Sequence, residues 1–136
     1  MRFIIDWPDR RLFPNARVHW AVKAGKVHEA RNRAHSQAVA CLKSLPEDEK
    51  DWLDSNNKLP YGLVITPPDN RHRDEDNIIA ALKASLDGIA TGLGVNDSRF
   101  RLSWIRWSEP AKTAHIVVAL LEPPPLDFLE NFYARK

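Results

Sequence analysis

Apolar residues along this chain change their spacing from a strand-like to a helix-like period and back, and this pattern most constrains the fold. Residues 1–7 and 61–66 are rich in β-branched and aromatic side chains, which indicates two strands. Between them, residues 26–45 carry alanine and leucine at helical spacing, and Pro46 ends the helix. The alternation predicts a sheet covered by helices, which is the α+β class.

The second half of the chain predicts a further helix. Residues 76–89 place isoleucine and leucine on one stripe, as in an amphipathic helix. We expect Gly88, Gly92 and Gly94 to loosen this helix and end it. A short acidic segment, residues 47–53, predicts one additional helical turn.

Two more strands complete the expected sheet. Residues 99–108 alternate between apolar and polar, which predicts a half-buried strand with Phe100 and Trp104 on its apolar face. Trp107 falls on the opposite parity, where it would suit a dimer interface. We expect residues 113–121 to be the antiparallel partner of this strand. The result is a small mixed sheet with two main helices packed on one face.

The length of the chain predicts one domain. A total of 136 residues suffices for a single core, and we place the domain at residues 1–122. The triple proline Pro123–Pro125 separates a tail, residues 123–136. We expect this tail to pack on the domain or on a partner subunit, because it carries several large apolar side chains: Leu126, Phe128, Leu129, Phe132 and Tyr133.

The composition excludes several kinds of protein. A single cysteine, Cys41, excludes an intramolecular disulfide and a zinc site made of several thiolates. No apolar run reaches the roughly 20 residues that span a bilayer, so we expect no membrane partner and a cytoplasmic location. The net charge of +2 hides a basic segment, residues 1–33, and an acidic segment, residues 46–54.

Two aspartates at positions 74 and 76 are the strongest candidates for chemistry. In an extended segment, Asp74 and Asp76 would point to the same side, where a divalent cation relieves their repulsion. Arg71, His72 and Arg73 lie directly upstream and suit an anionic phosphodiester. The alternative is structural, since an aspartate before an apolar run is a favoured helix N-cap.

Asp97 and Lys83 are the next candidates, and each has a structural alternative. Asp97 lies in an Asn-Asp-Ser segment that suits a simple turn. Lys83 lies in the second predicted helix, four residues before Asp87, so the two side chains would pair on the helix surface.

Taken together, these motifs resemble the RusA family of Holliday-junction resolvases, which are small phage and prophage endonucleases. The resemblance rests mainly on the string Arg73-Asp74-Glu75-Asp76-Asn77 and on Asp97 within Gly94–Ser98. The opening of the chain is also similar, at Trp7-Pro8, Asn15 and His19-Trp20. The likeness extends loosely over about residues 3–120.

The resemblance implies a homodimer that binds four-way DNA junctions and cuts two opposed strands with Mg²⁺, without an organic cofactor, in recombination and repair. The family aspartates match Asp74, Asp76 and Asp97, which would bind the metal. The family also has a functional lysine four residues after the second aspartate, where this chain has Ala80. We expect Lys83 to take that role, since it lies on a similar helix face. The protein would work in the cytoplasm of a bacterial host.

DNA contacts are expected from arginines and one histidine. Arg99 and Arg101 would lie on the exposed face of their strand, opposite its apolar side chains. The full expected set is Arg10, Arg11, Arg17, Arg71, His72, Arg73, Arg99 and Arg101. Contacts of this kind go mainly to phosphates and make binding depend on salt.

Three alternatives stay open at this point. The chain could act on flaps or forks, could bind DNA without cutting it, or could be a structural domain whose aspartates only cap helices. A metal site also requires Asp97 to approach Asp74 and Asp76. A short second helix would let one chain close that site, whereas a helix ending near Thr91 would favour a site shared across the dimer.

Overall fold

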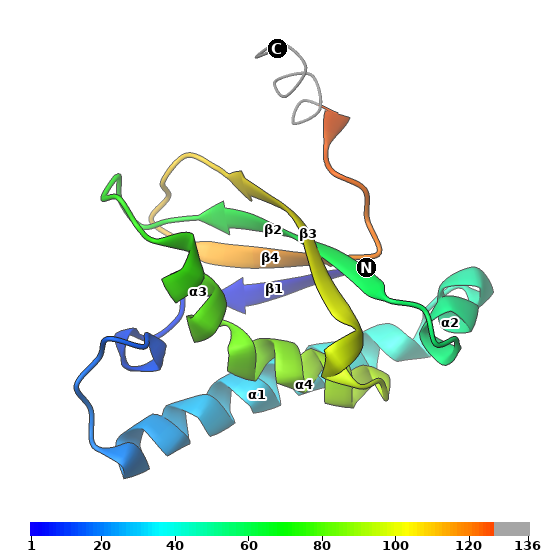
Figure 1. Cartoon of the computed structure of the whole chain (residues 1–136), viewed down its shortest axis with the longest axis horizontal. Coiled ribbons are helices and arrows are strands. Elements are labelled where there is room, and N and C mark those ends of the chain that lie inside the picture. The colour runs from blue at the N-terminus through cyan, green and yellow to red at the C-terminus, as the bar shows by residue number, and fades with distance from the viewer. Residues whose placement is uncertain (127–136) are drawn as a thin grey trace.

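The structure is a computed structural model that describes residues 1–126, and it has the expected α+β class. A mixed sheet of four strands forms one layer, and helices lie along one side of it (Figure 1). In chain order the elements are β1 (Arg2–Asp6), the 3₁₀ turn η1 (Arg10–Leu12), α1 (Trp20–Lys43), α2 (Glu47–Asp54), β2 (Leu59–Thr66), α3 (Glu75–Ala81), α4 (Lys83–Leu93), the 3₁₀ turn η2 (Asp97–Arg99), β3 (Phe100–Trp107) and β4 (His115–Leu120).

The strand order β1-β4-β2-β3 corrects the expected pairing of the last two strands. β3 runs parallel to β2, and β4 runs antiparallel to both β1 and β2. The hairpin prediction was wrong because α3 and α4 carry the chain back along the sheet, which makes β2 and β3 a parallel crossover pair. The almost uninterrupted apolar run of β4 is typical of a central strand, and β4 does lie between two neighbours.

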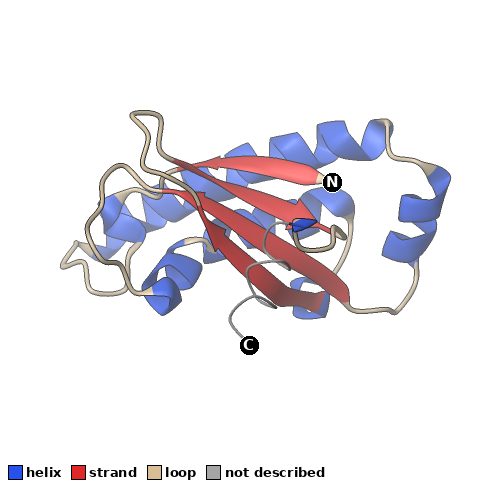
Figure 2. Cartoon of the chain, turned by 90° about the horizontal axis from the view of Figure 1, so that it is seen from above, coloured by secondary structure: helices blue, strands red, loops and turns tan. Residues whose placement is uncertain are grey.

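The core lies between the sheet and the two long helices. Alternate residues of β1, β2 and β4 face these helices, and Phe3, Leu63, Ile65 and Ile116 are almost fully buried there. α1 and α4 run side by side beneath this face, and none of the helices α1–α4 covers the opposite face of the sheet (Figures 1 and 2). Two main helices on one face were predicted correctly.

A β-bulge in β3 overturns the expected placement of Trp104. The pairing with β2 shifts between Tyr61 and Gly62, so that Tyr61 is opposite Leu102 and Gly62 is opposite Trp104. The extra residue, Ser103, moves Trp104 to the face away from the helices. The indole packs directly over Gly62, where an added Cβ would lie 1.9 Å from it. Trp107, opposite Ile65, lies on the helix side instead.

Both long helices are longer than predicted. α1 begins at Trp20 rather than at residue 26, with the His19 side chain accepting a hydrogen bond from the Ala21 N–H. The second helix is continuous through Gly88 and Gly92 except for an interruption at Leu82. Those two glycines allow α1 and α4 to approach closely, because a Cβ at Gly88 would lie 2.2 Å from the Arg31 carbonyl oxygen. Gly94, with φ +75°, ends α4.

The predicted tail lies largely outside the described residues, which end with Leu126, an exposed side chain. Its packing on the domain or on a partner therefore stays a prediction. Within the described part of the chain, no helix combines the length and the apolar character that a membrane span requires.

Candidate functional site

Asp74 and Asp76 occupy the start of α3, just after the loop that leaves β2. Asp74 is extended and caps the helix: its carboxylate accepts a hydrogen bond from the Asp76 N–H at 2.9 Å. Asp76 already belongs to the first helical turn, so the two aspartates are not both extended as predicted. The structural alternative for Asp74 is therefore observed. Both carboxylates are nevertheless exposed and could contact a ligand.

The loop before α3 is organised around Asp69. Its carboxylate accepts hydrogen bonds from the Arg71 N–H at 3.0 Å and from Arg73 Nη2 at 2.7 Å. These contacts, the Arg71 N–H first and then both guanidinium groups, lower the pKa of Asp69 to about 2. The Arg73 guanidinium also lies 5.2 Å from the centre of the Trp7 ring. Arg73 is thus held in place beside Asp74, while Arg71 and His72 are exposed.

Asp97 lies beyond the far end of α4, in η2, and it faces Asp87 rather than the start of α3. Burial raises the pKa of Asp87, and hydrogen bonding and repulsion by the Asp97 carboxyl raise it further, against the attraction of Lys83. Lys83 is exposed at the first turn of α4, four residues before Asp87. Its expected catalytic role stays a prediction, and Lys83 attracts the Asp87 carboxylate without forming an ion pair with it within residues 1–126.

The acidic residues at the start of α3, Asp74 and Asp76, are separated along the helical segment from Asp87 and Asp97. Asp87 follows Asp76 by eleven positions, which corresponds to roughly 16 Å of helix. Within residues 1–126, no three His, Cys, Asp or Glu side chains gather so that they could hold a metal ion. The donor chemistry suits Mg²⁺, but the geometry of one chain does not form the expected three-aspartate site. α4 ends only at Leu93, which is the arrangement that favours a shared site.

The arginines of the N-terminal loop surround a hollow of about 340 Å³, together with Phe13, Ala16 and Val18. Arg11 is engaged with Asp9 through two hydrogen bonds of 2.9 Å, which hold the pKa of Asp9 well below its usual range. Arg10 and Arg17 are exposed, and their guanidinium groups form no ion pair or hydrogen bond with another residue of the described chain. They are the best placed of the predicted arginines for contacts with phosphate.

Arg99 does not lie on an exposed strand face as predicted. It ends η2, and its guanidinium donates to the carbonyl oxygens of Leu53 at 2.7 Å, Asn57 at 2.9 Å and Trp52 at 3.1 Å. It therefore ties the end of α2 to the start of β3. Arg101 is exposed, although one of its nitrogens donates to the Ser98 and Phe100 carbonyls.

Sequence reasoning missed the role of Asp69 and the contact of Asp87 with Asp97. Each acid lies four residues from a basic residue already singled out, Arg73 and Lys83 respectively. For Lys83 and Asp87, this spacing within a helix indicated a surface pair. Asp69 lies in a loop, where the same spacing carries no such signal, and only the folded loop brings it against Arg73.

No known protein-family model matches the chain. The chain is 34% identical over 100 residues to an uncharacterized protein of Xylella fastidiosa (strain Temecula1). The match covers 71% of this chain and 60% of that protein, so the chain spans less than two thirds of the relative.

Proposed function

We propose that the protein is a Mg²⁺-dependent endodeoxyribonuclease of the RusA type that nicks four-way DNA junctions as a homodimer. The observation that carries this proposal is the start of α3: two exposed carboxylates, Asp74 and Asp76, stand directly beside the basic Arg71 and His72. Anionic and cationic groups side by side suit a phosphodiester that must be bound and cut.

The separation of the acidic groups shapes the proposal. Because one chain does not bring Asp97 to Asp74 and Asp76, we propose that two copies combine them, the start of α3 from one and η2 from the other. A two-fold dimer would then hold two such sites, which suits paired cuts in a symmetric substrate. Asp97 lies against Asp87, and a cation bound at η2 would relieve the repulsion between these two carboxyl groups.

The exposed cations would bind the DNA backbone on either side of the carboxylates. Arg71 and His72 precede Asp74 in the same loop, whereas Arg10 and Arg17 line the hollow near the start of α1. Arg73 would instead position the loop, since Asp69 and Trp7 hold its guanidinium. Junction binding should weaken with rising salt, because each phosphate contact releases counterions.

A cleavage assay on synthetic four-way junctions tests the activity. Wild-type protein with Mg²⁺ should produce paired nicks, and Asp76→Asn should abolish them while binding is kept. Ser36→Ala, on the exposed side of α1, is the matched control and should cut normally. Intact junctions at saturating Mg²⁺, with protein shown to be bound, would contradict the proposed activity.

Mixing two inactive variants tests the shared site separately. Asp76→Asn and Asp97→Asn proteins are unfolded and refolded together, so that mixed dimers form. If two chains build each site, a mixed dimer holds one intact site, and the mixture regains nicking of one strand. If each site comes from one chain, the mixture stays inactive even though wild-type protein treated in the same way cuts.

A second candidate is a junction-binding protein that does not cut DNA. The observations that favour it are Ala80, exposed where the related enzymes have lysine, and the capping role of Asp74. It predicts junction binding that does not depend on Mg²⁺ and is unchanged in Asp97→Asn. Parallel assays on flaps, forks and linear duplex separate junction cleavage from the action on other branched DNA.

A further inference from the structure

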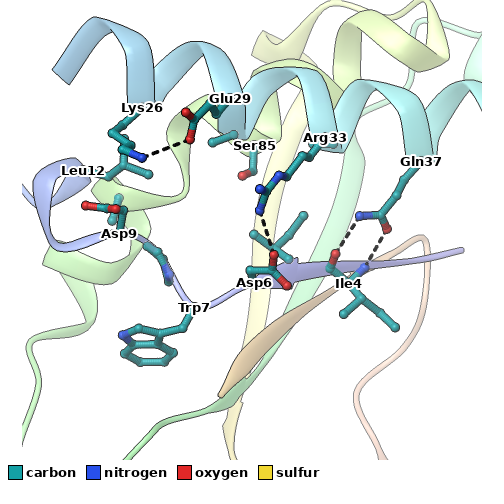
Figure 3. Close-up of a pocket in the computed structure, with 15 residues that line it drawn as sticks. Ile4, Asp6, Trp7, Asp9, Leu12, Lys26, Glu29, Arg33, Gln37 and Ser85 are labelled. Atoms are coloured by element: carbon teal, nitrogen blue, oxygen red, sulfur yellow. Dashed lines mark hydrogen bonds and ion pairs between the residues drawn. The ribbon is translucent and has the colours of Figure 1, made fainter. Parts of the chain in front are cut away.

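A cavity of about 330 Å³ lies between the outer edge of β1 and α1, and Asp74, Asp76 and Asp97 do not line it (Figure 3). Its volume falls at the lower end of the range of about 300–1,000 Å³ that is typical of ligand sites. The walls include the small side chains of Ala30 and Ala34 from α1, and Ala81 and Ser85 come from α3 and α4. These small side chains leave the space between helix and strand unfilled.

Ser85 gives the cavity a polar group without a partner. The residue is only 3% exposed and lines the cavity, and its hydroxyl forms no hydrogen bond with another residue of the described chain. No fully buried side-chain oxygen among the described residues lacks a partner, so this hydroxyl is reached from the cavity and is not sealed in the core. Its position favours a bond to something that enters the cavity.

The edge of β1 supplies the main polar surface. Met1 and Leu120 exchange both main-chain hydrogen bonds, at 2.9 and 2.8 Å, and the Trp7 N–H donates to the Ala114 carbonyl. In an antiparallel pair the bonded residues alternate, so the N–H and C=O of Ile4 and Asp6 point away from β4.

The amide of Gln37 pairs with the main chain of this edge at Ile4. Its Oε1 accepts a hydrogen bond from the Ile4 N–H at 3.0 Å, and its Nε2 donates to the Ile4 carbonyl at 2.7 Å. An amide group from α1 therefore occupies one outward-facing position of the strand. The next outward-facing main-chain position of β1 belongs to Asp6, which lies about 7 Å further along the strand and lines the cavity. Its carboxylate pairs with Arg33, but its main chain has no such partner within residues 1–126.

We propose that the cavity binds a short extended peptide segment, whose main chain pairs with the N–H and C=O of Asp6 and so lengthens the outer edge of β1. This is the strand-addition mode of peptide recognition. Leu12, Ala30 and Ala34 would contact a small apolar side chain, and the Ser85 hydroxyl would form a hydrogen bond with the segment. The charges at the rim are already paired, Lys26 with Glu29 and Arg33 with Asp6, which favours an uncharged segment over an anion.

An NMR titration of the ¹⁵N-labelled full chain with N-acetyl-dialanine N-methylamide tests the proposal. Saturable shifts are expected at the Asp6 and Ser85 amides, with slower hydrogen exchange at Asp6. An analogue with one amide N–H replaced by an ester oxygen should bind about three- to tenfold more weakly, since one hydrogen bond is lost. An absence of saturable shifts, or equal binding of the ester, would overturn the proposal.

Variants locate the binding. Ala30→Leu fills the cavity and should abolish the shifts, whereas Ala40→Leu, on the same helix but outside the cavity, should leave them unchanged. Gln37→Ala exposes the Ile4 position and should increase the affinity for a peptide that is two residues longer. Binding retained in a folded Ala30→Leu protein, or acetamide saturating the same shifts as tightly as the peptide, would exclude an extended segment in this cavity.

Discussion

At the scale of single residues, Arg99 is the side chain whose role the fold changes most. Its three hydrogen bonds to carbonyl oxygens join α2, the following loop and β3. Arg99→Ala should lower the free energy of unfolding by about 2–3 kcal/mol, because hydrogen bonds from a charged donor are lost. Urea unfolding measures this loss. Arg17→Ala, which removes an exposed guanidinium, is the control and should change the free energy of unfolding by less than about 0.5 kcal/mol. If Arg99→Ala lost no more than this control, Arg99 would have no structural role.

Asp69 makes part of the stability depend on acid pH. Its pKa is about 2 in the folded chain against 3.8 ordinarily, so it stabilises the fold above pH 4, and this contribution is lost as the pH falls through 2. Asp69→Asn should therefore unfold at lower urea concentration than wild type at pH 5, and this difference in midpoint should shrink toward pH 2. Urea midpoints at several pH values measure it, and a difference that does not vary with pH would contradict this.

Asp87 changes the pH dependence of stability in the opposite direction to Asp69. Burial and Asp97 raise its pKa in the folded chain, so the fold loses stability as the pH rises above 3.8, where the unfolded chain ionises. Asp87→Asn should raise the melting temperature at pH 7 and have little effect at pH 3.5. Asp54→Asn, an exposed carboxylate in α2, is the control and should shift neither value. A lower melting temperature for Asp87→Asn at pH 7 would show that the carboxylate is instead stabilising.

At the scale of elements, the contact between α1 and α4 depends on glycine. Gly88→Ala would place a Cβ 2.2 Å from the Arg31 carbonyl oxygen, so the helices must separate and the variant should lose about 1–3 kcal/mol or more. Gly25→Ala, in open space on α1, should gain about 0.5–1 kcal/mol from helix propensity. Thermal unfolding of both variants measures the contrast, and a neutral Gly88→Ala would mean that the two helices can move apart freely.

At the scale of the whole molecule, the proposed site requires a second copy. Sedimentation should give a mass twice the 15.6 kDa of one chain at the concentrations that support cleavage. If cleavage follows the dimer, specific activity should fall on dilution below its dissociation constant. A monomer that cuts junctions at full rate would require Asp74 and Asp76 to act without Asp97.

The sequence by itself determined the α+β class, the approximate extent of the elements and the candidate residues, because these depend on local spacing and residue type. The tertiary structure decided three further features. These are the place of β4 between β1 and β2, the position of Trp104 on the sheet face away from α1 and α4, and the contact of Arg99 with the end of α2. Strand order and a one-residue bulge bring together residues far apart in the chain, and periodicity within a segment carries no information about them. For the same reason, the separation of Asp97 from Asp74 was decided by where α4 ends.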